Sequence, residues 1–149
     1  MGYLDLADRA WPALTRVMGL HTAAYRATGG VIGHRIPGLP PMLLLDHTGA
    51  KSGTRRTTPL LYLRDGRDLV IVASKGGYGK HPAWLHNLRA HPETTVQIGR
   101  ERVAVRAREA TEGERPRLWP RAVATYSSYQ DYQDRTERRI PLVILEPRD

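Results

Sequence analysis

The stretch PLLYLRDGRDLVIVA, residues 59–73, places two apolar runs on either side of an Asp-Gly pair. Each run, 59–63 and 69–73, has the length of a β-strand, and Asp-Gly between two such runs is a strong signal for a tight hairpin. We therefore expect two antiparallel strands joined by a turn at residues 64–67. A hairpin here favours a mainly β fold over a wound α/β sheet.

Four more segments have the pattern of strands: residues 42–45, 94–98, 103–107 and 140–145. Gly99 marks the turn between the second and third of these. Pro141 stands near the start of the last one, where a missing N–H does little harm. Six strands in a hairpin-like order predict an α+β, mainly β fold, a small antiparallel barrel with flanking helices.

An amphipathic helix is expected near the N-terminus, because apolar residues recur there at helical spacing. They are Leu4, Ala7, Trp11, Leu14, Met18 and Tyr25. Asp8 can cap this helix and Pro12 fits its first turn. Residues 29–41 hold four glycines and three prolines and must form a loop. The chain thus divides into residues 1–40, a helix and linker, and residues 41–149, the barrel.

Two further helices are expected between the strands. One covers residues 81–90. The other begins at Thr111, where Thr111 and Glu114 have the spacing of a capping box. Pro116 and Pro120 make that helix irregular.

The composition excludes several classes of protein. The absence of cysteine rules out disulfides, thiolate metal sites and a cysteine nucleophile. The six histidines lack zinc-motif spacing, so no metal site is expected. No run approaches the roughly 18 apolar residues of a spanning helix, and Met1 opens no leader pattern, so we expect a cytoplasmic protein.

The net charge of +8 is concentrated in the middle of the chain. Residues 50–106 carry 11 basic and 4 acidic residues, a balance of +7. Such a field attracts an anionic partner, although a solvated basic face would have the same composition.

A basic glycine turn lies inside this segment. Gly49 and Gly53 bracket Lys51, but the spacing is too short for a nucleotide-binding P-loop. Exposed amides with Lys and Arg suit a phosphate. Strand alternation places Arg55 and Arg56 on opposite faces, so only one can line a site, and we expect Arg56. The alternative is a charged hairpin tip in water.

A second basic glycine loop, residues 74–80, leads into the helix at 81–90. A glycine loop before a helix N-terminus is a ready anion site, and the two loops together could hold one ligand with several charges. Trp84 and Asn87 share a helix face. Trp84 either packs on a ligand ring or belongs to the core.

Tyr126, Tyr129 and Tyr132 share one side if their segment is helical. Three phenols on one face form an apolar wall with polar tips, which suits a flat substrate, although a packing helix has the same spacing. No triad, paired carboxylate or nucleophile elbow is present, so any chemistry is expected to belong to a bound cofactor.

Five motifs together carry a resemblance to a known family. They are Gly49-x-Lys51-Ser52-Gly53, Arg56 with Pro59-Leu60, Ala73-Ser74-Lys75-Gly76-Gly77, Pro82-x-Trp84-x-x-Asn87-Leu88 and Tyr126-x-x-Tyr129-Gln130-Asp131-Tyr132. In this order, over about residues 40–147, the chain resembles the deazaflavin-dependent nitroreductase family of actinobacteria, which uses coenzyme F420. The resemblance implies a split β-barrel. It also implies a cofactor with a phosphate and an oligoglutamate tail, a polyanion that would account for the charge.

The resemblance also implies site residues. The loop around Lys51 and Arg56 would hold the phosphate region, while residues 72–75 and 83–87 would line the deazaflavin. The implied cofactor-binding residues are Thr48, Ala50, Lys51, Ser52, Gly53, Thr54, Arg55, Arg56, Thr58, Pro59, Val72, Ala73, Ser74, Lys75, Gly76, Ala83, Trp84, Asn87 and Tyr129. The implied catalytic residues, a wall in front of the ring, are Ser74, Tyr126, Tyr129 and Tyr132.

The implied activity is that of an F420H2-dependent oxidoreductase. It would transfer hydride from the reduced deazaflavin to a small acceptor: a menaquinone-like quinone, a nitroaromatic or an activated alkene. Nitroimidazole reducers of the family carry Tyr where this chain has Leu61, so we expect a different preference among acceptors.

Three alternatives stay open: a barrel that holds FMN or haem, a non-catalytic protein that binds the deazaflavin, and a basic nucleic-acid-binding module. The tyrosines lie outside the basic segment, which argues against nucleic acid as the partner. The first helix either packs on the core or a partner, or lies on the inner face of the plasma membrane. The oligomeric state stays open.

Overall fold

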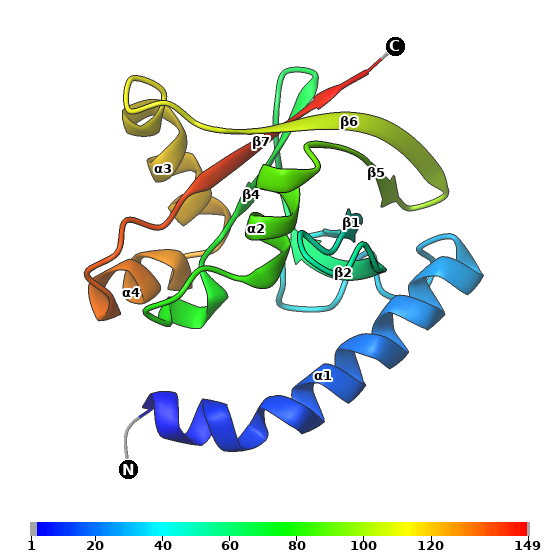
Figure 1. Cartoon of the computed structure of the whole chain (residues 1–149), viewed down its shortest axis with the longest axis horizontal. Helices are drawn as coiled ribbons and strands as arrows, with labels where there is room; N and C mark the ends of the chain where they lie inside the picture. Colours follow the sequence, from blue (N-terminus) through cyan, green and yellow to red (C-terminus); the bar gives the residue numbers. More distant parts are fainter. Residues whose placement is uncertain (1–2, 149) are drawn as a thin grey trace.

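A computed structural model describes the backbone of residues 3–148 and the side chains of residues 16–148. At its centre is one antiparallel sheet of seven strands in the order β2-β1-β5-β6-β7-β4-β3, curled into a half-barrel (Figure 1). The strands are β1 (Met42–Thr48), β2 (Arg55–Leu61), β3 (Leu63–Asp65), β4 (Asp68–Val72), β5 (Glu93–Ile98), β6 (Glu101–Glu109) and β7 (Leu142–Pro147). The mainly β, antiparallel fold predicted from the sequence is confirmed.

The run at residues 59–63, predicted as part of one strand, contains a corner. β2 pairs with β1, whereas β3 pairs with β4, so the chain changes partner at Tyr62. There the Tyr62 amide donates to the Pro41 carbonyl at 3.4 Å. The predicted Asp-Gly turn is present between β3 and β4, with Gly66 at a φ of 61°.

The hairpin-like strand order was wrong for β4. This strand pairs with β7 and not with β5. Helix α2 (Ala83–Ala90) lies between β4 and β5 in the chain, and β5 joins the sheet beside β1. The apolar pattern of the sequence was enough to locate these strands. It could not predict their pairing, because α2 separates β4 from β5 and β5 pairs with β1.

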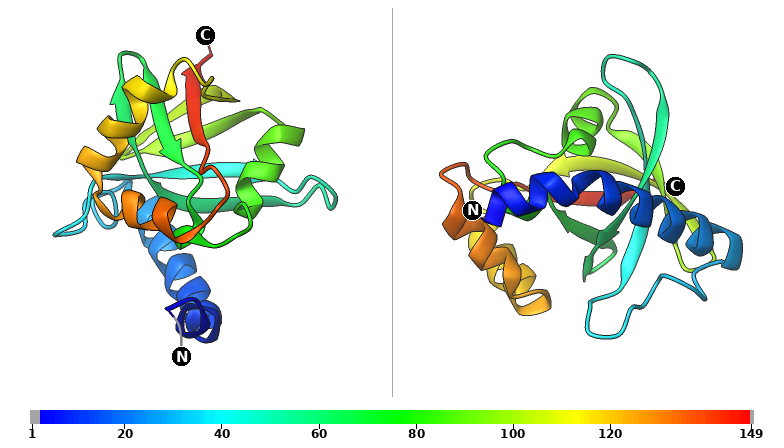
Figure 2. Two further views of the ribbon diagram at one scale, coloured as in Figure 1. Left: turned by 90° about the vertical axis from the view of Figure 1, so that its left-hand side faces the viewer. Right: turned by 90° about the horizontal axis from the view of Figure 1, so that it is seen from below.

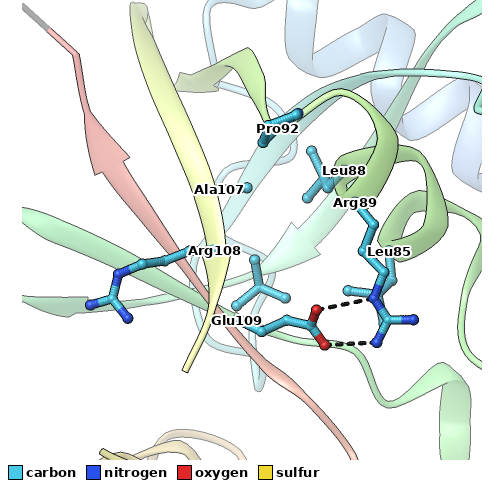
Figure 3. Close-up of a pocket in the computed structure, with 8 residues that line it drawn as sticks. Leu85, Leu88, Arg89, Pro92, Ala107, Arg108 and Glu109 are labelled. Carbon is cyan, nitrogen blue, oxygen red and sulfur yellow. Dashed lines mark hydrogen bonds and ion pairs between the residues drawn. The ribbon is translucent and has the colours of Figure 1, made fainter. Parts of the chain in front are cut away.

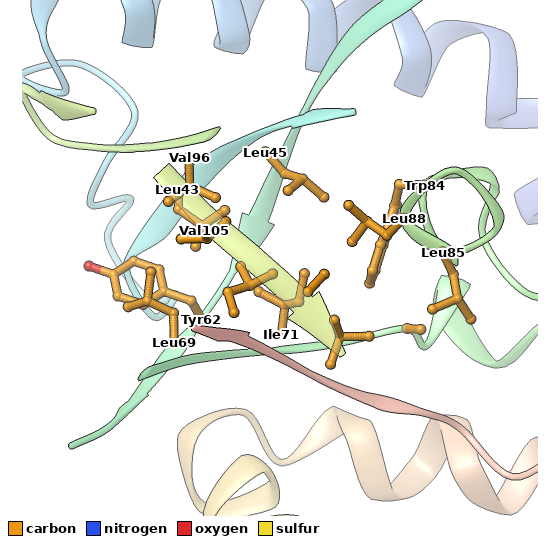
Figure 4. Packing of buried hydrophobic residues seen from close by; sticks show 14 residues of the cluster. Leu43, Leu45, Tyr62, Leu69, Ile71, Trp84, Leu85, Leu88, Val96 and Val105 are labelled. Atoms are coloured by element: carbon orange, nitrogen blue, oxygen red, sulfur yellow. The ribbon is translucent and has the colours of Figure 1, made fainter. Parts of the chain in front are cut away.

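Alternation along the strands gives the sheet two apolar faces. On β4, Leu69 and Ile71 enter the interior cluster, which Trp84, Leu85 and Leu88 of α2 complete (Figure 4). Val70 and Val72 enter a second cluster on the opposite face, beneath α3 (Arg115–Thr125) and α4 (Ser128–Arg135). A period of two therefore supplies both layers from one strand.

The predicted capping box is formed ahead of α3. The Thr111 amide donates to the Glu114 carboxylate at 2.9 Å, and the Glu114 amide donates to the Thr111 hydroxyl at 3.2 Å. The regular helix begins only at Arg115, because residues 111–114 form a turn. Pro120 lies inside this helix.

Helix α1 (Tyr3–Thr28) is anchored at one end and projects from the barrel (Figure 2). It begins before Asp8 and Pro12, so the predicted start was wrong, and the helix follows the apolar periodicity from Leu4 instead. The stripe side chains Leu4, Ala7, Trp11 and Leu14 lie outside the described side chains. Of the two stripe residues whose side chains are described, Met18 is 37% exposed and Tyr25 is packed in the core.

The anchor of α1 is Tyr25, which is fully buried. Its hydroxyl donates to the Met42 carbonyl at 2.9 Å and accepts from the Gly99 amide at 2.8 Å. Gly30 follows the helix, and a Cβ there would come within 2.5 Å of the Gly99 Cα, so backbone meets backbone at this point. Within the described part of the chain, no helix is long and apolar enough to cross a bilayer.

Candidate functional site

The first basic loop closes the β1–β2 hairpin. The Gly53 amide donates to the Gly49 carbonyl, and the Gly49 amide to the Thr54 carbonyl, each at 2.9 Å. Gly53 has a φ of 70°, which favours glycine. Lys51 and Ser52 lie exposed at the tip of this turn. The loop thus presents a cation and a hydroxyl on a short, internally bonded frame.

The two arginines that follow lie on opposite faces of β2, as predicted. Arg55 lies 3.6 Å from the carboxylate of Asp46. Arg56 pairs in register with His47 on β1. The face of Arg56 also carries Thr58, whose hydroxyl lies 2.8 Å from His47 Nε2. Arg55, one of the residues implied to bind the cofactor, therefore points to the other side of the hairpin.

Asp46 gathers three arginines from distant parts of the chain. Its buried carboxylate accepts hydrogen bonds from Arg26 of α1 and from Arg102 of β6, both at 2.9 Å, beside the contact with Arg55. Several arginines of residues 50–106 are thus committed to ion pairs: Arg55, Arg89, Arg102 and Arg106. Two of their acidic partners, Asp46 and Glu109, lie outside residues 50–106 and offset part of the +7 balance of that segment.

Asn87 connects the first loop to α2. Its side-chain oxygen accepts from the Ala50 amide at 2.9 Å, and its nitrogen lies 2.9 Å from His47 Nδ1. Because Asn87 can only donate from that nitrogen, His47 is neutral, accepts at Nδ1 and donates from Nε2 to Thr58. Burial, followed by the charge of Arg56, lowers the pKa of His47. Asn87 was predicted to face a ligand, but its amide here holds the loop.

The second basic loop has an unusual backbone. Ser74 is in the right-handed region, and Lys75, Gly76 and Gly77 follow with φ of 45°, 63° and 83°. A right-handed residue before a left-handed one turns successive amides toward one point, a concavity that binds anions. Lys75 is the one non-glycine residue with positive φ within the described backbone. A lysine in this conformation costs on the order of 1 kcal/mol.

Trp84 lies in the core, which was the second of the two positions expected for it, and does not project toward a ligand. The side chain is only 6% exposed and belongs to the interior cluster with Leu45 and Leu88. Little of the indole is therefore available to a ligand ring.

The three tyrosines come together as predicted, although they do not share one helix: Tyr129 and Tyr132 lie on α4, and Tyr126 is the extended residue that ends α3. The ring centres of Tyr126 and Tyr129 are 5.1 Å apart, and Tyr132 lies 6.4 Å from each. The hydroxyls of Tyr126 and Tyr132 are 3.5 Å apart. Tyr129 is buried, and this burial, followed by the two neighbouring phenols, raises its pKa. Leu61 packs against the same apolar cluster.

The tyrosine segment also meets the second loop. The short 3₁₀ helix η1 (Lys75–Gly77) packs on α4. A Cβ at Gly77 would lie 2.9 Å from the Tyr132 carbonyl oxygen, so only glycine fits there. Ser74 and Lys75 are thereby held near the tyrosines. The first loop joins this arrangement through α2, because Asn87 of this helix accepts from the Ala50 amide and the helix follows the second loop in the chain.

A hollow of about 220 Å³ lies between α2 and β6 (Figure 3). Leu85, Leu88 and Val143 line it, and a bidentate pair of Arg89 with Glu109, at 2.7 and 3.0 Å, borders it. None of the residues predicted for the site lines this hollow. The described side chains hold no group of His, Asp or Glu suited to a metal ion.

Sequence reasoning missed two residues at the site. His47 sits in an apolar strand, and its partners become visible only from the register with β2. Arg138 lies in the connection from α4 to β7, and its side chain bonds to the second loop. Neither has a local sequence signal, because each acts on residues that are distant in the chain.

Comparison with known proteins identifies close relatives. A family model described as F420H(2)-dependent quinone reductase matches residues 17–147. An F420H(2)-dependent quinone reductase of Mycobacterium tuberculosis strain H37Rv is 46% identical over 136 residues, which cover 89% of this chain and 91% of the relative.

Two solved structures are similar as well. A structure of an F420-H2 dependent reductase, FDR-A, has a TM-score of 0.66 at 42% identity, and the match covers 71% of this chain and 94% of that one. A structure described as a domain-swapped dimer has a TM-score of 0.68 at 36% identity, with 91% of this chain and 98% of that chain covered.

Proposed function

The chain belongs to the F420H(2)-dependent quinone reductase family, and on that premise we propose that it transfers hydride from reduced coenzyme F420 to a quinone. The observation that carries the proposal is the contact of the second basic loop with the tyrosine segment at Gly77. The contact supports the proposal because the second loop has groups suited to an anionic cofactor and the tyrosines offer a surface suited to a flat acceptor.

The residues of the two loops fit the chemistry of such a cofactor. Lys51, Ser52 and Arg56 offer two cations and a hydroxyl on one hairpin, and the backbone of residues 74–76 offers converging amides beside the Lys75 ammonium. These are donors for phosphate and carboxylate, the anionic groups of F420. When bound, the deazaflavin supplies the hydride. Lys51 and Arg56 would hold its phosphate region, while Val72, Ala73 and Ser74 would orient the ring.

The acceptor would lie against Tyr126, Tyr129 and Tyr132. Their rings exclude water, and a quinone oxygen that gains negative charge as hydride arrives needs a hydrogen-bond donor and then a proton. Tyr126 and Tyr132 are half-buried, with hydroxyls close together, and suit that role, as does the Ser74 hydroxyl. Tyr129, with its raised pKa, would instead supply apolar surface.

Leu61 supports a quinone over a nitroaromatic as the preferred acceptor. It packs on the cluster that contains the three tyrosines, where the nitroimidazole reducers would place another phenol. An isobutyl group offers apolar contact to a quinone ring and its side chain but no hydrogen bond to a nitro oxygen.

The exposed apolar side of α1 supports peripheral binding to a membrane, the phase in which such quinones dissolve. Val17 and Leu20, one turn apart on this helix, are 61% and 73% exposed. A relative that forms a domain-swapped dimer offers the competing use, exchange of segments between two copies. Co-sedimentation with phosphatidylglycerol vesicles that is lost in Leu20→Asp would support membrane binding. A protein that is dimeric by light scattering and does not bind the vesicles would reject it.

Titration and turnover test the function directly. We expect oxidised F420 to bind the purified chain with micromolar or better affinity, measured by cofactor fluorescence, and menadione to oxidise bound F420H2 catalytically. FMN titrated in parallel should bind much more weakly. Binding of FMN but not of F420 would reject the cofactor, and binding of F420 without turnover would leave a non-catalytic carrier.

A further inference from the structure

The side chain of Arg138 is hydrogen-bonded to the backbone of the second basic loop. Its Nε donates to the Tyr78 carbonyl at 2.7 Å, its Nη2 to the Ser74 carbonyl at 2.6 Å and its Nη1 to the Ala73 carbonyl at 3.1 Å. Nη1 also lies 3.1 Å from His81 Nδ1. One guanidinium thus binds the loop at Ser74 and Tyr78 and also contacts the residues on either side of it, Ala73 and His81.

This arrangement uses the particular geometry of arginine. The planar guanidinium directs five N–H groups in fixed directions, and donors that carry charge make the stronger hydrogen bonds. Arg138 is half-buried, and burial lowers its pKa, yet arginine stays charged at any ordinary pH. A lysine at this position has one nitrogen and cannot reach three carbonyls at once.

The chain around Arg138 belongs to the other half of the proposed site. Arg138 follows α4, whose Tyr129 and Tyr132 form the acceptor wall, and the backbone of Tyr132 touches Gly77. Two separate contacts therefore join the loop to the tyrosine segment, one by hydrogen bonds and one by close packing.

We propose that Arg138 is a positioning residue that fixes the distance between the cofactor loop and the acceptor wall. The inference rests on the proposed function. Arg138 would touch neither reactant, because its donors are directed at the backbone carbonyls of residues 73–78 and at His81. It keeps Ser74 and Lys75 in place relative to Tyr126 and Tyr132, and a reaction between two bound groups loses rate steeply when they are misplaced by about 1 Å.

The test compares Arg138→Met and Arg138→Lys with Arg115→Met. Arg115 is a matched control, because it is also half-buried and donates to the Ile140 carbonyl at 2.6 Å and to the Gln133 side chain at 3.2 Å. It supports the same connection to β7 but makes no hydrogen bond to residues 73–81. If Arg138→Met does not fold, the comparison with Arg115→Met is made with Arg138→Lys alone.

Hydrogen exchange without cofactor is the first measurement. Both Arg138 variants should exchange amides of residues 74–81 at least about tenfold faster, with β5 and β6 unchanged, whereas Arg115→Met should leave this loop unchanged. In turnover, kcat with menadione should fall at least about tenfold in the Arg138 variants, with less change in KM, and should stay within about twofold in Arg115→Met.

Unchanged exchange at residues 74–81 in both Arg138 variants would overturn the inference, as would equal losses of kcat in the Arg138 and Arg115 variants. If the wild type fails to bind F420, the proposed function fails, and the exchange measurement still decides whether Arg138 holds the loop.

Discussion

Asn87 and Ala50, 37 residues apart in the chain, are joined by a hydrogen bond of 2.9 Å from the Ala50 amide to the Asn87 side-chain oxygen. The same side chain reaches His47, so one buried amide holds both the strand and the turn of the first loop. The position of Lys51 therefore depends on α2.

Replacing Asn87 should loosen that loop. We expect Asn87→Leu to lower the free energy of unfolding by about 2 kcal/mol, because it leaves the Ala50 amide and His47 Nδ1 without a partner, and a buried unsatisfied group costs about 1–3 kcal/mol. The affinity for F420 should fall as well. Urea unfolding and fluorescence titration measure the two effects, and a stability loss with unchanged affinity would show that the tether does not position the site.

Removing the Lys51 charge should weaken cofactor binding and leave stability unchanged. We expect the Kd for F420 to rise at least about tenfold in Lys51→Ala, because a lost charged contact is worth roughly 1.5–3 kcal/mol. Arg67→Ala, in the turn between β3 and β4, removes the same charge elsewhere and is the control. If the Kd for F420 were equal in the two variants, Lys51 would contribute only to the overall positive charge and would not contact the cofactor.

Lys75 should show a conflict between stability and function. Lys75→Gly relieves the positive φ of 45° and should raise the free energy of unfolding by up to about 1 kcal/mol. The same change removes the ammonium and should weaken F420 binding. Lys75→Ala, which loses the charge and keeps the strain, separates the two effects. A less stable Lys75→Gly variant would mean that the lysine side chain itself stabilises the loop.

Stability should fall as the pH drops below about 6.5, the ordinary pKa of histidine. Burial lowers the pKa of His47, His34 and His81, so in this range the unfolded chain binds more protons than the folded one. The contribution is complete above the unfolded pKa and is lost as pH falls toward the folded values. Unfolding followed from pH 8 to pH 5 should show this slope. His47→Gln should reduce it, and an unaltered slope would assign the effect to the other two histidines.

The tyrosines should differ in turnover. Tyr126→Phe and Tyr132→Phe should each lower kcat with menadione by about tenfold or more, a common loss when a positioned proton donor is removed. Tyr129→Phe should change kcat by less than about twofold, because burial raises the pKa of that hydroxyl. Steady-state kinetics near pH 7 decide between them. A larger effect at Tyr129 would place the donor at the buried hydroxyl instead.

The sequence was most informative where the cause of structure is local. The Asp-Gly turn, the alternation that separates Leu69 from Val70, and the capping box of Thr111 with Glu114 all depend on neighbours in the chain, and each is present. The spacing predicted the grouping of Tyr129 and Tyr132, because both lie on α4, whereas Tyr126 joins them from the extended end of α3.

Features that depend on distant segments could not be predicted in the same way. The pairing of β4 with β7, the burial of Trp84 and the ion pairs of Asp46 all arise from elements that meet only in the folded chain. His47 and Arg138 belong to this class too, since their partners lie on other strands and loops. The roles assigned to single residues toward the cofactor and the acceptor stay predictions.

The corner at Tyr62 has a mechanical consequence. β2 and β3 are the two outermost strands of the sheet, yet they are consecutive in the chain and separated by this single residue. A pull that peels one border of the sheet is therefore transmitted directly to the other. Because its two edge strands are linked at Tyr62, the half-barrel should break as one unit under force and should not lose its strands one at a time.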